Sequence, residues 1–339
     1  MKLHPRISRF LRWAIAVIAM GVVVRQLVSD PEPLRRMWAA GPQTLAGMCA
    51  LVVLNQALMS LRFAQVLNHM GAPRVGFGAW FRITSVGQML NLFVPQLGNV
   101  YRGVALKRDY GISYLTWATG LISFVWLDMV GGVLIAMLAI GVLDPHLRFA
   151  GLSAELLLAL GLTAIFFGPI AAAFVFERLP PRSGFLGKLQ RRLTTLLSTA
   201  SAAARSPGLM ARFFSLNVVV TIGQTATLWL AFHSVGAAIP LSGLLLFQIL
   251  VKLTSQVVIT PGNLGITELA FGALAHGSAR TVEQGLAVSL LLRAVGSAMV
   301  VLLGALSGGA SELFSGRRAL LQQGDELAEP DQGFSATKK

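Results

Sequence analysis

Hydrophobic residues in this chain fall into long uninterrupted runs, separated by short basic or polar connections. A membrane-spanning helix needs about 20 largely apolar residues. Six runs meet that length, at about 11–29, 42–61, 115–142, 152–176, 210–235 and 284–308. The pattern predicts an all-α fold, a polytopic bundle of membrane helices with about six full spans.

Two further runs are long enough but more polar, at about 77–94 and 243–260. Each ends in a proline-containing break, the first at Pro95 and the second at Pro261-Gly262. Proline removes a backbone donor and kinks or ends a helix. These two runs are therefore predicted to differ from the six plain spans.

The distribution of basic residues predicts the orientation of the chain. Cytoplasmic loops carry an excess of Lys and Arg. By this rule the basic N-terminus and the connections 62–76, 96–114 and 177–208 are cytoplasmic, whereas 30–41, 143–151 and 236–242 lie outside. Both chain termini are then expected in the cytoplasm.

This orientation has a consequence for the two polar runs. The segment 77–94 lies between two cytoplasmic connections, so it must enter the membrane and return, and the segment 243–276 must do the same from outside. Two opposed re-entrant helical hairpins in matching places are typical of an inverted repeat around a central site. Eight plain crossings remain the alternative.

The same pattern predicts the domain organisation. Residues 1–312 form one membrane domain, with halves at about 1–176 and 209–312 joined by the basic cytoplasmic loop 177–208. Residues 313–339 are expected to be a polar, disordered tail.

Composition supports the membrane class. Hydrophobic residues make up 55% of the 339 residues and charged residues 12%, about half of the roughly 25% in a soluble domain. The net charge of +14 fits cytoplasmic loops and anionic lipid head groups. No aromatic–basic platform is visible, so nucleic acid is not expected as a partner.

Charges inside apolar runs are costly and mark functional positions by default. The acidic candidates are Asp128 and Glu268, and the basic candidates are Arg82, Arg102, Lys252 and Arg293. The excess of cations suits an anionic group such as a lipid phosphate, which Arg can bind bidentately. Arg102, Lys252 and Arg293 are expected to bind that group together.

The first break contains Asn91, Pro95, Gly98 and Arg102. Glycine lets the backbone approach a ligand closely, and Asn91 shares a helix face with the polar residues before it. The alternative is a polar seam packed between helices.

The second break contains Pro261, Gly262, Gly265 and Glu268. A helix that starts here presents free N–H groups, which attract anions. Glu268 is expected to set the local charge or to gate the hairpin. The alternative is a structural ion pair of Glu268 with Lys252 or Arg293.

At these breaks the chain resembles the membrane region of lysylphosphatidylglycerol synthases, also called the flippase-like family. A first motif of that family corresponds to Pro95, Gly98, Arg102, Leu106, Arg108 and Gly111. A second, P-G-x-x-G-x-x-E, corresponds to Pro261, Gly262, Gly265 and Glu268, and a later L-L-R to Leu291, Leu292 and Arg293. Asn99 and Met129 depart from the pattern, because the family usually carries an acid and often an arginine there.

The resemblance implies lipid handling. In the full-length synthases this region is thought to move aminoacylated phospholipid across the bilayer, while a separate soluble domain makes it. We find no such catalytic domain in this sequence, so we do not expect synthase activity.

The resulting hypothesis is a bacterial inner-membrane lipid translocase for an anionic phospholipid or lipid-linked precursor. An accessory protein without transport activity, presenting lipid to a lipid-synthesis enzyme or glycosyltransferase, is the alternative. An integral membrane transferase is less favoured, because no nucleophile or metal motif is seen. No cofactor, metal or catalytic residue is predicted, and the lipid and the oligomeric state stay open.

Overall fold

The computed structural model describes residues 21, 25, 28, 32, 35, 36, 40–94, 96–149, 151–178, 207–255, 263–278 and 280–309. The expected span at 11–29 lies almost entirely outside these residues, and so do most of loop 177–208 and the tail 313–339. Pro95, Pro261 and Gly262 also lie outside the described residues.

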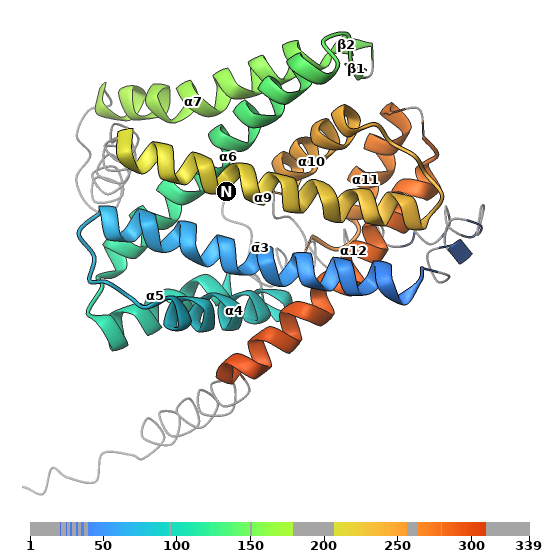
Figure 1. The fold of residues 1–339 in the computed structure, drawn as a ribbon. Helices are drawn as coiled ribbons and strands as arrows, with labels where there is room; N and C mark the ends of the chain where they lie inside the picture. The colour runs from blue at the N-terminus through green and yellow to red at the C-terminus, as the bar shows by residue number, and fades with distance from the viewer. Residues whose placement is uncertain are drawn as a thin grey trace, which may run out of the picture.

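The described chain is helical apart from one short strand pair (Figure 1). The first half contains α3 (Pro42–His69), α4 (Phe77–Phe93), α5 (Leu97–Tyr110), α6 (Tyr114–Leu143), β1 (Arg148–Phe149), β2 (Leu152–Ser153) and α7 (Ala154–Arg178). The second half contains α9 (Pro207–Ser234), α10 (Leu241–Ser255), α11 (Ile266–Gly277), α12 (Val282–Gly304) and a terminal π-helical turn, η2 (Ala305–Gly309). The predicted all-α class is confirmed.

Within the described ranges, 4 helices are long and apolar enough to cross a membrane: α3, α6, α9 and α12 with its π-helical end. They match the expected runs 42–61, 115–142, 210–235 and 284–308. A shorter apolar stretch at Ala154–Gly168 lies in α7, at the expected run 152–176. The count of six full spans stays a prediction.

Two connections expected from the sequence are wrong. Residues 62–69 continue α3 rather than starting a loop, because apolar Phe63, Val66 and Leu67 keep helical spacing and are buried. Most of the expected loop 96–114 is α5, which is too polar to be recognised as a membrane helix. It ends at Gly111, whose φ of 68° is the left-handed C-cap conformation.

Each half repeats one arrangement, a long helix, a pair of shorter packed helices and a second long helix. The pairs are α4–α5 and α10–α11. α4 and α5 run antiparallel, because Gly98 lies against Gly87 and Arg102 against the earlier Thr84. The packing between halves is matched, because α4 packs on α12 and α10 packs on α6. The main helix contacts are therefore the same in both halves when α3 is matched with α9, α4 with α10, α5 with α11 and α6 with α12.

The equivalent helices α3 and α9 run antiparallel through the middle of the bundle (Figure 1). A Cβ on Gly47 would contact Leu230, a Cβ on Gly223 would contact Asn55, and Arg62 bonds Asn217. Positions therefore increase along α3 as they decrease along α9. Antiparallel packing of equivalent helices is what two inverted repeats produce.

Three large apolar clusters fill the part of the bundle that the structure describes. One lies among α3, α4, α5 and α6, where Phe63 contacts Trp80, Trp117 and Phe124. Another lies among α9, α10, α11 and α12 and includes Phe232, Phe247 and Phe271. A third cluster joins α6 and α7 to α10 and includes Val133, Leu158 and Ile249. The apolar core therefore continues from one half into the other.

Candidate functional site

A cavity of about 580 Å³ lies between the two halves. Its wall includes residues from α3, α4, α6, α9, α10, α11 and α12. Five amide side chains line it: Asn55, Gln56, Gln88, Gln224 and Gln248. A volume of several hundred Å³ with a few convergent polar groups is typical of a small-molecule or head-group site.

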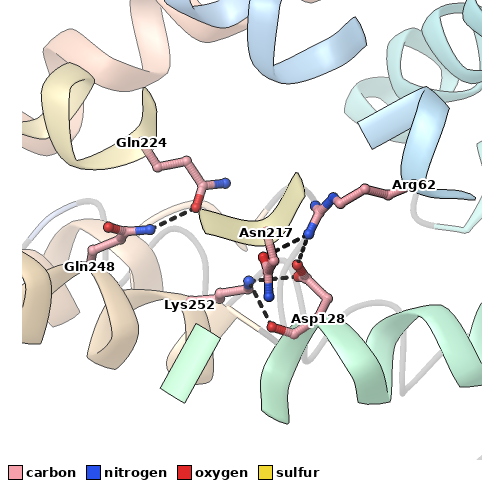
Figure 2. Close-up of polar contacts among 6 residues, drawn as sticks. All are labelled: Arg62, Asp128, Asn217, Gln224, Gln248 and Lys252. Atoms are coloured by element: carbon pink, nitrogen blue, oxygen red, sulfur yellow. Dashed lines mark hydrogen bonds and ion pairs between the residues drawn. The ribbon is translucent and has the colours of Figure 1, made fainter. Parts of the chain in front are cut away.

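Three charged side chains on the cavity wall form one network, with Asp128 at its centre (Figure 2). Asp128 Oδ1 accepts a hydrogen bond from Arg62 Nη1 at 2.5 Å, and Asp128 Oδ2 lies 2.7 Å from Lys252 Nζ. Lys252 also donates to the Asp128 backbone carbonyl at 3.2 Å. One carboxylate thus links α3 and α10 through α6.

Arg62 is held by further contacts. Its Nη1 donates to Asn217 Oδ1 at 2.8 Å, and its guanidinium lies 5.3 Å from the ring centroid of Phe124 and 5.4 Å from that of Phe213. Cation–π contacts of this kind stabilise a desolvated cation. Arg62 is therefore fixed, whereas Lys252 has a flexible stem and can change partner more easily.

Glycines on α6 allow this close approach. A Cβ on Gly131 would lie 2.3 Å from Asn217 Nδ2, and a Cβ on Gly132 would lie 3.3 Å from Lys252 Nζ. Both glycines follow Asp128 by about one helical turn. The charged network therefore depends on small residues beside it.

Amide hydrogen bonds extend the polar wall. Gln248 Nε2 donates to Gln224 Oε1 at 2.8 Å, and Gln248 Oε1 accepts from Thr225 Oγ1 at 2.5 Å. On the α4 side, Gln56 donates to Thr84 Oγ1 and Ser85 Oγ. The cavity thus has polar groups from both halves.

Arg102 does not line this cavity. It is buried against α4, where it donates to the Thr84 carbonyl at 3.0 Å and to Asn99 Oδ1 at 3.1 Å. Gly98 lies beside it, and a Cβ there would be 1.7 Å from the Gly87 carbonyl oxygen. Asn91 Oδ1 accepts from the Gly98 N–H at 2.7 Å. These residues hold α4 and α5 together.

Glu268 and Arg293 form a separate ion pair near the second break. Arg293 Nε donates to Glu268 Oε1, and Glu268 Oε2 accepts from the Gly265 N–H at 2.7 Å. Gly265 has a φ of 78°, which favours glycine. Glu268 is fully buried at the start of α11, so it caps this helix and ties it to α12.

The structure separates the three cations that were expected to bind one group. Only Lys252 lines the central cavity, together with Asp128 from the candidate acids. Arg102 and Arg293 lie in the two sites above, and Arg82 is exposed on α4. Desolvation of three cations around one cavity would cost more than pairing each with its own acceptors.

Sequence reasoning missed Arg62 and Asn217. Arg62 was assigned to a cytoplasmic connection because it follows an apolar run. The helical spacing of the buried residues after it was a signal that α3 continues. Asn217 carried no comparable signal, because a single amide is common in a membrane helix.

In the part of the chain that the structure describes, no three His, Cys, Asp or Glu side chains gather to hold a metal ion. Long apolar helices around a charged, amide-lined cavity define a multi-pass membrane protein with a polar site inside the bundle. The chain belongs to the family of the lysylphosphatidylglycerol synthase TM region, whose family model matches residues 9–304. No curated protein and no solved structure matches it.

Proposed function

We propose that this protein binds the anionic head group of a membrane lipid in the central cavity and carries it between the two leaflets. The observation that carries the proposal is the charge of the cavity wall. Among the described residues that line it, Arg62 and Lys252 are cationic and Asp128 alone is acidic. A phosphodiester, with one negative charge, balances that surplus.

Asp128 acts as an internal substitute for the phosphate. In the absence of lipid its carboxylate satisfies both cations, which would otherwise be buried at high cost. An entering phosphate offers equivalent oxygens to Lys252, while Arg62 stays bound to Asp128 and Asn217. Exchange of partners at Lys252 is then the binding step.

The matched halves support movement between leaflets. In this proposal α4–α5 and α10–α11 are re-entrant hairpins that enter from opposite faces, and the cavity lies between them. Small opposite movements of the two hairpins open the cavity to one leaflet and then to the other. The membrane is the bacterial inner membrane, with both termini in the cytoplasm.

We assign no catalytic group to this site. Transport is either facilitated or driven by an ion or lipid gradient. The partners are anionic membrane lipids. A lipid-synthesis enzyme or glycosyltransferase supplies or consumes them.

Native mass spectrometry of the purified protein tests the binding step. Vesicles of phosphatidylglycerol and phosphatidylcholine supply the lipid, and Lys252→Gln is compared with Arg82→Gln, which removes an exposed cation outside the cavity. Loss of a charge-assisted hydrogen bond, about 1.5–3 kcal/mol, predicts about a tenfold or greater loss of phosphatidylglycerol retention in Lys252→Gln only. Equal retention of both lipids by the wild type would overturn the proposal.

Leaflet exchange tests the transport step. Proteoliposomes containing fluorescent phosphatidylglycerol are treated with dithionite, which reduces only outer-leaflet dye. The wild type is expected to expose the inner-leaflet dye, and Lys252→Gln is expected to slow this. Selective binding without exchange would replace transport by the accessory, lipid-presenting role.

A further inference from the structure

A second hollow, the lateral groove, lies on the side of the bundle between α6, α9 and α10. Its volume is about 590 Å³. Its wall is apolar except for Thr221 and Thr225, and includes Ala139, Ile222, Ala226 and Trp229. Ile222 and Trp229 are at least half exposed, so the groove is open to the surroundings of the bundle.

The lateral groove and the central cavity are neighbours: on α9 their linings lie on different faces at the same level, and on α6 and α10 they lie at different levels. Both are lined by α6, α9 and α10. On α6 the cavity wall includes Asp128 and the groove wall includes Ala139. At 1.5 Å per residue these positions are about 16 Å apart, close to the ~15 Å that one leaflet contributes to the hydrocarbon core.

A polar bridge separates the two spaces. Gln224 and Gln248 line the cavity, whereas Thr225 lines the groove and donates to Gln248. Neighbouring residues of α9 thus face different spaces.

We propose that the lateral groove binds one acyl chain of the lipid whose head group occupies the central cavity. This inference rests on the proposed function and adds the site for the lipid tail. α6 and α9 are apolar and long enough to span a membrane, so the open side of the groove faces hydrocarbon. An acyl chain matches both the apolar wall and the rise of about 16 Å along α6 from Asp128 to Ala139.

The test uses phosphatidylglycerol with a diazirine on one acyl chain, in phosphatidylcholine vesicles with the full-length protein. After illumination, labelled peptides of α9 are identified by mass spectrometry. We expect labels at Ile222 and Trp229, and a several-fold decrease in Lys252→Gln. Diazirine phosphatidylcholine could instead label these residues as strongly as diazirine phosphatidylglycerol, with no change in Lys252→Gln. That result would show contact with the surrounding bilayer only and would overturn the inference.

A groove-filling variant gives a second test. Ala226→Phe is expected to remove the Lys252-dependent labels and to lower phosphatidylglycerol retention several-fold. Val219→Phe is the matched control, because Val219 is exposed on α9 but does not line the groove. If Ala226→Phe leaves the selective, Lys252-dependent retention of phosphatidylglycerol unchanged, the acyl-chain site is overturned but the head-group site is not. Absence of selective retention in the wild type would overturn the proposed function as well.

Discussion

Lys252 Nζ lies 2.7 Å from Asp128 Oδ2, although 124 positions separate the two residues along the chain. Lys252 belongs to the helical pair of the second half and Asp128 to a long helix of the first. Their ion pair therefore joins the two halves directly at the cavity wall. A movement of α10 away from α6 that exceeds the reach of the Lys252 stem breaks or exchanges this contact.

Removal of Asp128 is the first prediction. Asp128→Ala leaves Arg62 and Lys252 close together without their shared carboxylate, and breaking a buried pair costs about 3–5 kcal/mol. We expect a clearly lower midpoint of thermal unfolding in detergent. The double variant Asp128→Ala/Lys252→Ala should be less destabilised than the sum of the two single variants. Additive losses of stability in the double variant would contradict an energetic coupling between Asp128 and Lys252.

The second prediction concerns the contact between α4 and α5. Gly98→Ala places a Cβ within 1.7 Å of the Gly87 carbonyl oxygen, so the two backbones must separate. Overpacking of this kind costs typically 1–3 kcal/mol, and occasionally more. We expect lower folded yield in size-exclusion chromatography. Gly78→Ala is the control, because a Cβ there meets nothing within 4 Å, and it should behave as the wild type.

The third prediction separates the two roles of Glu268. Glu268→Gln keeps a side-chain oxygen that can accept from the Gly265 N–H, but it loses the ion pair with Arg293. Glu268→Ala loses both. Breaking a buried charged pair costs about 3–5 kcal/mol, and loss of a helix cap adds about 1 kcal/mol. The midpoint of thermal unfolding should be highest for the wild type, lower for Glu268→Gln and lowest for Glu268→Ala. Equal midpoints for the two variants would show that the hydrogen bond to the Gly265 N–H does not stabilise the protein.

Much of the fold could be predicted from the sequence because apolar runs report membrane helices directly. Four expected runs are the long helices, and the proline-containing breaks fall between the helices of the two pairs. α5 was missed because hydrogen bonds from buried Arg102 to the Thr84 carbonyl and to Asn99 Oδ1 let a polar segment pack as a helix. Hydropathy cannot report such a local pairing.

The composition of the site was harder to predict than its existence. Asp128 and Lys252 stand out as charges inside apolar runs, so their place in a polar site inside the bundle could be predicted from the sequence. Their pairing could not, because it depends on α10 of one half crossing to α6 of the other. For Glu268, an ion pair with Lys252 or Arg293 was the alternative to a gating role, and the structure shows the pair with Arg293.

The last prediction concerns the side of the membrane on which the first helical pair ends. Because α4 and α5 are antiparallel, the end of α3 and the start of α6 come close together, and a Cβ on Gly120 would contact Leu67. In a re-entrant hairpin, exposed His69 and Asp109 must therefore face one compartment.

Cys49 is the single cysteine of the chain, so Cys49→Ser provides a background for His69→Cys and Asp109→Cys. A membrane-impermeant maleimide applied to intact cells should give both positions the same low labelling, and both should label after permeabilisation. His146 is exposed in the turn that follows α6, and His146→Cys should label in intact cells. Opposite labelling of positions 69 and 109 would replace the hairpin by a full crossing and would remove the opposed entry that the proposed leaflet exchange requires.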